Sequence, residues 1–139
     1  MNQTTSSTVT GLPAATVVVS RALPAAIAGA RDVARAFLDS LQLAVGPDTA
    51  DSVVLVVSEL VTNALRHAGG ACVLQLTAHP DTIEVAVRDS CPRAPRMRAP
   101  DLNGGTGGFG WPMVDRLTRN TTVTPDETGG KFVRAFLPR

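Results

Sequence analysis

The sequence has no tyrosine, a single tryptophan and two cysteines, and these scarcities exclude several classes of protein. Cys72 and Cys91 lie far apart and have neither a CxxC nor a Cys/His metal spacing, so we expect two reduced thiols. The longest uninterrupted apolar run, Val53–Val57, is far short of the roughly 20 residues that cross a bilayer. We therefore expect no disulfide framework, no metal centre built on cysteine and no membrane contact.

Signals for export and for nucleic-acid binding are also lacking. The amino terminus has no basic start followed by an apolar stretch, so we expect a cytoplasmic protein. The net charge is only +1, and the densest basic stretch, Arg88–Arg98, holds prolines and no aromatic residue. We interpret that stretch as a loop and expect no nucleic-acid partner.

What the sequence does contain is enough apolar material for one packed core. It has 139 residues, of which 44% are hydrophobic and 18% charged, which is typical of a single globular domain. Residues 1–14 are rich in Thr and Ser and show no periodicity, so we expect a disordered tail there. Residues 15–139 are expected to form the single domain.

The hydrophobic pattern of residues 15–139 alternates between strand and helix periods. Strands are predicted at Thr16–Ser20, Cys72–Ala78, Thr82–Arg88, Thr121–Thr124 and Phe132–Leu137, and helices at Pro24–Leu43, Asp48–His67 and from about Trp111. The order β-α-α-β-β-loop-α-β-β predicts an α+β fold, an α/β sandwich. In it a mixed, mostly antiparallel sheet carries helices packed on one face.

The second predicted helix holds the most informative polar residues. Glu59, Asn63 and His67 are spaced i, i+4, i+8, so they project from roughly one face. A carboxylate, an amide and an imidazole beside an apolar segment are costly to bury without partners. The spacing alone fits two interpretations equally well, a ligand site and a solvated stripe at the end of an amphipathic helix.

Asp89 and a glycine run provide two further candidates. Asp89 follows a predicted strand and opens a Gly/Pro-rich loop, which favours a ligand contact, although a loop-capping aspartate is the alternative. The run Gly104–Gly110 stops at a helix start, where backbone N–H groups favour an anion such as a phosphate. The alternative is a flexible linker, but a linker gives no reason for the glycines to end at a helix.

Two better-known phosphate motifs are excluded by their context. Gly105, Gly107 and Gly110 satisfy GxGxxG, but a proline-rich loop precedes them rather than a strand of a βαβ unit. Gly130-Lys131 has the end of a P-loop, but Phe132 stands where Ser or Thr is required, and a strand follows.

Taken in order, these pieces resemble the Bergerat (GHKL) ATP-binding family, and most closely its branch of anti-sigma-factor serine/threonine kinases. Glu59-Leu60-Val61-Thr62-Asn63-Ala64 followed by His67 looks like the family's N box. Asp89 looks like the aspartate of the first glycine box. Gly107-Gly108-Phe109-Gly110 looks like the second box, where the ATP lid joins a helix.

The resemblance implies a role for each matching residue. Asn63 would hold the Mg²⁺ that bridges the triphosphate of ATP, and Glu59 would orient or deprotonate the attacking hydroxyl. Asp89 would accept a hydrogen bond from the adenine amino group. The phosphates would be met by backbone N–H groups of Gly107, Gly108 and Gly110, and His67 would add a cationic contact. Phe132 stands where a threonine often completes the adenine-side hydrogen bonds.

The resemblance also implies a regulatory function. The chain would bind a sigma factor and phosphorylate a serine or threonine of an anti-anti-sigma partner of the STAS type, and it would form a homodimer. The alternative is a non-catalytic partner-switching module that binds nucleotide or only protein. The catalytic half of a histidine kinase is disfavoured, because the chain has no room for a phosphoacceptor helix pair.

Overall fold

The computed structural model describes residues 4–9, 11–20, 25–67, 70–90, 110–127 and 129–139. In these residues the elements follow one another as β1 (Thr4–Val9), β2 (Leu12–Ser20), α1 (Ala26–Asp39), α2 (Pro47–His67), β3 (Ala71–Ala78), β4 (Thr82–Asp89), α3 (Gly110–Leu117), β5 (Asn120–Pro125) and β6 (Lys131–Pro138). From residue 16 onward, the predicted order of helices and strands is therefore confirmed.

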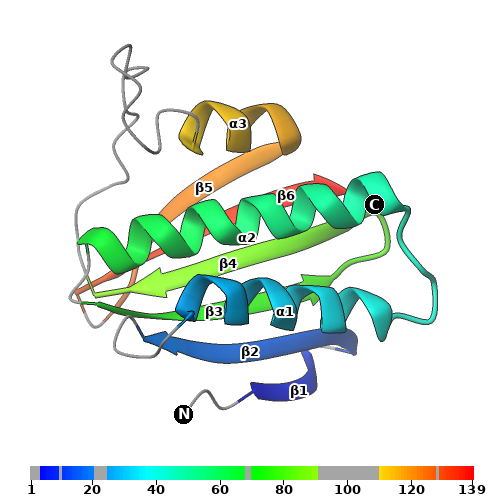
Figure 1. The fold of residues 1–139 in the computed structure, drawn as a ribbon, viewed down its shortest axis with the longest axis horizontal. Coiled ribbons are helices and arrows are strands. Elements are labelled where there is room, and N and C mark those ends of the chain that lie inside the picture. Colours follow the sequence, from blue (N-terminus) through cyan, green and yellow to red (C-terminus); the bar gives the residue numbers. More distant parts are fainter. Residues whose placement is uncertain (1–3, 10, 21–24, 68–69, 91–109, 128) are drawn as a thin grey trace.

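The strands form one sheet in the order β1-β2-β3-β4-β6-β5, and the helices lie along one face of it (Figure 1). Every pairing among the described strands is antiparallel. The predicted α+β sandwich is confirmed, with a sheet that is antiparallel throughout its described part rather than mixed. Within the described ranges, none of the helices has both the length and the apolar character needed to cross a membrane.

The core lies between the sheet and the helices because the strands alternate with a period of two. Alternate residues of β3, β4 and β6 are buried on the helical side, while their neighbours on the open side, apart from the buried Ala86, are at least partly exposed. Helix α2 is central: it packs against α1, α3 and the sheet, which explains why its first half is apolar nearly all round. The largest fully buried side chains are Leu74, Leu76, Ile83, Leu137, Val17, Val19, Val53, Val56, Val57, Val61, Val85 and Val87.

Helix α1 is shorter than the predicted span Pro24–Leu43. The helix ends at Asp39 because Ser40 hydrogen-bonds to the carbonyl groups of the last helical turn. Its backbone N–H donates to the carbonyls of Ala36 and Phe37, both at 3.1 Å, and its hydroxyl donates to the Phe37 carbonyl at 2.6 Å. These bonds satisfy the carbonyls that a helix end leaves without partners. Leu43 then lies beyond the helix, 76% exposed.

The amino-terminal region differs from its prediction. Strand β1 pairs with β2 from Thr4 opposite Val17 to Val9 opposite Leu12, and β2 itself begins at Leu12. The prediction of a disordered tail over residues 1–14 is thus wrong for these strand residues. The pairing of an edge strand rests on backbone hydrogen bonds, which require no alternation of apolar side chains, and composition alone therefore missed it.

Candidate functional site

Glu59 and Asn63 lie one turn apart on α2, and both are partly exposed. No hydrogen bond or ion pair joins either side chain to another residue of the described part of the chain. The residues around them, Leu60, Val61 and Ala64, are buried in the core. The helix thus carries a carboxylate and an amide at the edge of the apolar core, and neither has a partner among the residues that the structure describes. This arrangement is suited to contacting a ligand.

His67 is the last residue of α2, so the predicted stripe ends where the helix ends. The structure describes the backbone of His67 and not its side chain, and its predicted cationic contact remains a prediction. Its neighbour Arg66 is exposed. The stripe therefore runs along the second half of α2 toward its carboxyl end.

Asp89 is the last residue of β4 rather than a residue of the following loop. Its side chain is only 3% exposed and lies on the helical side of the sheet. The Nζ of Lys131 is 3.0 Å from its Oδ1, and the Lys131 side chain is 6% exposed. Asp89 and Lys131 also face each other in the register of β4 and β6. These two are the buried polar or charged residues of the described chain.

Lys131 is the residue of this region that sequence reasoning missed, because a lysine after two glycines is typical of an exposed turn. The signal that could have found it is strand alternation. Lys131, Val133, Ala135 and Leu137 share one face of β6, and the last three are plainly apolar. Continuing this alternation from Val133 back to Lys131 places the Lys131 side chain inside the protein.

Phe132 lies on the face of the sheet opposite Asp89, because neighbouring strand residues alternate between faces. It pairs with Arg88 in the β4–β6 register, and the guanidinium of Arg134 lies 4.4 Å over its ring. The prediction that Phe132 takes the place of an adenine-side threonine is therefore wrong. The residue of β6 that faces Asp89 is Lys131.

Two further contacts, one of Gly130 and one of Asp126, hold the turn before Lys131 against the end of β4. A Cβ atom at Gly130 would clash with the backbone carbonyl of Asp89, so only glycine fits there. Arg88 Nε donates to Asp126 Oδ2 of the turn at 2.8 Å. The turn itself is closed by the Asp126 N–H, which donates to the Gly130 carbonyl at 2.9 Å. The carboxylate of Asp89 and the ammonium of Lys131 are thus held by a fixed backbone frame.

Cys72 is the third group of this buried row. It pairs with Val19 of β2 and precedes Val73, which pairs with Arg88, so the register brings it beside Asp89. Burial, together with the smaller effect of the negative charge of Asp89, raises the pKa of the Cys72 thiol from 9.0 to about 12. Cys72 is therefore a neutral, buried thiol, as expected for a reduced cysteine without a catalytic function.

Of the predicted glycines, Gly107 and Gly108 lie outside the described residues. Gly110 is the first residue of α3, which confirms the prediction that the glycine run ends at a helix start. Helix α3 packs against α2 and buries Val114 in the core. Pro112 lies in its first turn, where a residue without an N–H costs no helical hydrogen bond.

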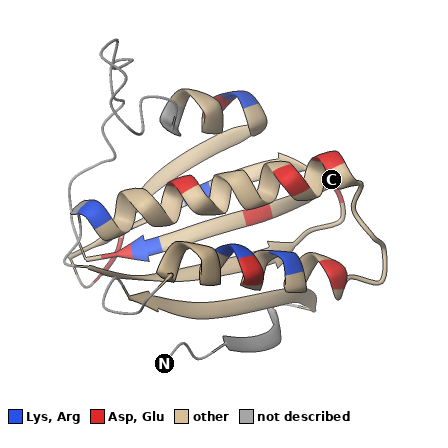
Figure 2. Ribbon diagram, viewed as in Figure 1, with Lys and Arg blue, Asp and Glu red and all other residues tan. Residues whose placement is uncertain are grey.

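The described parts of the candidate site gather at one end of the molecule. Figure 1 shows the carboxyl end of α2, the carboxyl end of β4 and the start of α3 at the same end, and α2 contacts both β4 and α3. Strands β2 and β3 carry no charged residue, whereas β4 carries two of its three at this end (Figure 2). Residues far apart in the sequence thus lie at the same end of the molecule (Figure 1).

A separate cleft of about 520 Å³ lies between the start of α1 and the second half of α2. It is lined by Ala25, Ala26, Ile27, Ala28, Arg31, Thr62, Leu65 and Arg66. None of the predicted site residues lines it, because the cleft opens on the side of α2 that faces α1. We therefore do not assign it to the candidate site.

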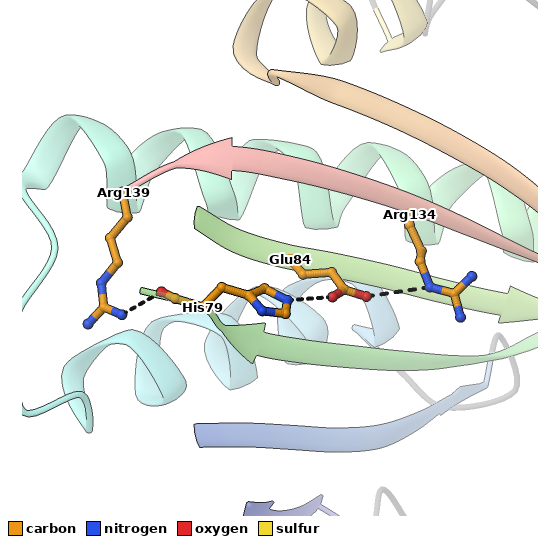
Figure 3. Close-up of polar contacts among 4 residues, drawn as sticks. All are labelled: His79, Glu84, Arg134 and Arg139. Atoms are coloured by element: carbon orange, nitrogen blue, oxygen red, sulfur yellow. Dashed lines mark hydrogen bonds and ion pairs between the residues drawn. The ribbon is translucent and has the colours of Figure 1, made fainter. Parts of the chain in front are cut away.

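A polar cluster on the open face of the sheet lies toward the opposite end of β4 (Figure 3). Glu84 is 2.7 Å from Nε2 of His79 and 3.4 Å from Nε of Arg134. Arg139 donates to the backbone carbonyl of His79 at 2.9 Å, which ties the carboxyl end of the chain to the β3–β4 turn. Every charge in the cluster has a protein partner, and we interpret it as structural.

Comparison with protein families agrees with this architecture. A family model described as a histidine kinase-like ATPase domain matches residues 20–136. The chain therefore belongs to the histidine kinase-like ATPase family, and the resemblance to Bergerat-type domains is confirmed at that level. No curated protein matches the chain. Domains of this family bind ATP, usually with Mg²⁺.

The residues present fit such a ligand by their chemistry. Among the described residues no group of three or more His, Cys, Asp or Glu is placed to hold a metal ion. Mg²⁺ commonly takes one or two protein oxygens and completes its shell with phosphate oxygens and water, so the amide oxygen of Asn63 would suffice as its protein ligand. The carboxylate of Asp89 is an acceptor of the kind that an exocyclic amino group requires.

Proposed function

We propose that the chain is an ATP-dependent regulatory kinase that binds a sigma factor and phosphorylates a serine or threonine of a STAS-type anti-anti-sigma partner. The observation that carries the proposal is the pair Glu59 and Asn63, which lie one turn apart on α2 and have no side-chain partner among the described residues. A carboxylate is not needed to bind a nucleotide that is already anionic. The presence of the Glu59 carboxylate one turn from the Asn63 amide therefore favours phosphoryl transfer over nucleotide binding alone.

Each residue would act by positioning and charge. When ATP and Mg²⁺ are bound, the metal neutralises charge on the triphosphate, and Asn63 would hold it. Glu59 would orient the partner's hydroxyl and accept its proton. Asp89 would hold the base, and the N–H groups of Gly107, Gly108 and Gly110 would face the phosphates. Together these residues would contact the base, the metal ion, the phosphates and the attacking hydroxyl.

A second candidate is a partner-switching module without catalysis. The observation that favours it is the pairing of Asp89 with Lys131, because a carboxylate that is 3% exposed and already bound to a cation is less accessible to a base. In this case the chain would act through protein contacts alone, or with nucleotide as a weak effector.

Substitution of Glu59 separates the two candidates. Glu59→Gln keeps the shape and hydrogen-bonding capacity of the side chain but removes the base, and Glu127→Gln in the exposed β5–β6 turn is the matched control. The readout is transfer of γ-labelled phosphate from ATP to a purified STAS-type protein of the same organism. The kinase predicts transfer that Glu59→Gln lowers by about a hundredfold or more. Equal nucleotide binding by wild type and variant with no transfer by either would favour the switching module.

A further inference from the structure

The buried pair of Asp89 and Lys131 is not explained by stability alone. Removing two charges from water costs several kcal/mol each, and their attraction in the interior only about repays it. Apolar residues of similar volume would stabilise the sheet equally well, as they do at every other inward position of β4 and β6. The pair therefore adds little net stability to the core, and a role in binding a ligand explains its presence better.

The location of the pair points to the same conclusion. It lies at the carboxyl end of β4, at the same end of the molecule as the carboxyl end of α2, whose second half carries Asn63 (Figure 1). The other ion pairs described in the protein are more exposed: the Arg88–Asp126 side chains are 42% and 14% exposed, and the Arg134–Glu84 side chains are 30% and 17% exposed. Lys131, the buried cation among the described residues, is thus placed against the carboxylate at the candidate nucleotide site.

The geometry gives Lys131 control over the position of that carboxylate. Its Nζ lies 3.0 Å from Asp89 Oδ1, and its own backbone is fixed by the register with Asp89 and by the contact of Gly130 with the Asp89 carbonyl. A lysine tethered at both its backbone and its ammonium leaves the carboxylate little freedom to rotate. It also supplies the counter-charge that a buried carboxylate needs.

We infer that Lys131 is a positioning residue of the nucleotide site, which holds Asp89 in the orientation that accepts the amino group of the base. This inference rests on the proposed nucleotide-binding function and extends it to Lys131, to which the family resemblance gives no role. Lys131 acts through Asp89, whereas other groups contact the phosphates. Its removal should therefore weaken binding of bases that carry the amino group and leave the rest of the nucleotide unaffected.

A pair of ligands isolates this effect. ATP and purine riboside 5′-triphosphate differ only in the 6-amino group, and both are titrated with Mg²⁺ by calorimetry. Wild type should prefer ATP by roughly tenfold or more, the size expected for one hydrogen bond to a charged group. Lys131→Met should reduce this preference to about threefold or less and leave the affinity for the purine riboside analogue within about threefold. Lys131→Arg should retain the preference.

Arg134→Met is the matched control, since it removes a cation from the same strand on the opposite face and should change neither affinity. If circular dichroism shows that Lys131→Met does not fold, Lys131→Gln, which keeps a donor without the charge, is held to the same criterion. Equal loss of affinity for both ligands in the Lys131 variant would indicate a merely structural role and overturn the inference, as would an undiminished preference for ATP. Wild type that binds both ligands equally would overturn the role of Asp89 and Lys131 at the base, whereas wild type that binds neither would overturn the proposed function itself.

Discussion

Asp89 and Lys131 form a cross-strand ion pair inside the protein, with 3.0 Å between Oδ1 and Nζ and side chains that are 3% and 6% exposed. The pair joins the last residue of β4 to the first residue of β6. Its surroundings include the neutral thiol of Cys72 on β3, whose pKa responds to the charge of Asp89. One end of the sheet therefore carries a charged row within an otherwise apolar core.

Breaking this pair should destabilise the fold far more than breaking an exposed pair. Asp89→Asn removes the carboxylate charge that faces the buried ammonium of Lys131, and we expect a loss of roughly 3–5 kcal/mol in the free energy of unfolding. Asp126→Asn, which removes the partly exposed partner of Arg88, should cost at most about 1 kcal/mol. Urea unfolding followed by circular dichroism measures both values.

The double variant Asp89→Leu with Lys131→Met provides the complementary test. Because two apolar side chains remove both desolvation costs at once, it should be more stable than Asp89→Asn alone. Equal stability of Asp89→Asn and wild type would show that the ion pair does not form in solution.

Gly130 should tolerate no side chain. A Cβ atom at this position meets the backbone carbonyl of Asp89, and a backbone atom in a paired strand cannot move aside. We expect Gly130→Ala to lower the free energy of unfolding by roughly 1–3 kcal/mol, the usual cost of overpacking. Gly46→Ala is the control, since nothing lies within 4 Å of its added Cβ, and a change within about 0.5 kcal/mol is expected there. Similar effects of the two substitutions would contradict the described contact between the turn and β4.

The buried thiol of Cys72 should make stability depend on alkaline pH. Its pKa is about 12 in the folded protein and near 9.0 in the unfolded chain. Between these values the unfolded chain releases a proton that the folded protein keeps, so folding stability falls as the pH rises. The slope contributed by this group approaches about 1.4 kcal/mol per pH unit above pH 9, and its contribution is constant below that.

Comparison with Cys72→Ala isolates this contribution, because all other groups titrate alike in both proteins. The difference in unfolding free energy between wild type and Cys72→Ala should be constant from pH 7 to 8.5 and shrink from about pH 9 to 10.5. Parallel profiles over the whole range would show that the thiol has an ordinary pKa.

The sequence predicts the elements with strong periodicity and misses the features that depend on pairing. The apolar run Val53–Val57 and the stripe from Glu59 to His67 define α2 to within one residue at its start, since both faces of a helix are encoded locally. Strand β1 was missed because its partner, β2, supplies the hydrogen bonds that stabilise it.

The candidate site shows the same division between local and long-range information. The i, i+4 spacing of Glu59 and Asn63 is a property of one helix, and the structure confirms that both lie on it. The contact of Asp89 with Lys131 joins residues 42 positions apart, and only the β4–β6 register specifies it. The motif alone therefore indicates Phe132 as the residue at the adenine-side position. Phe132 is the neighbour of Lys131 in the sequence and lies on the opposite face of the sheet.

The most direct test of nucleotide binding is a calorimetric titration of ATP into wild type and Asn63→Ala, each with and without Mg²⁺. Asn120→Ala, an exposed asparagine at the start of β5, is the matched control. We expect Mg²⁺-dependent binding of ATP to wild type and to Asn120→Ala, and the loss of this binding in Asn63→Ala. No binding to wild type at millimolar ATP, or metal-dependent binding that Asn63→Ala leaves intact, would contradict it.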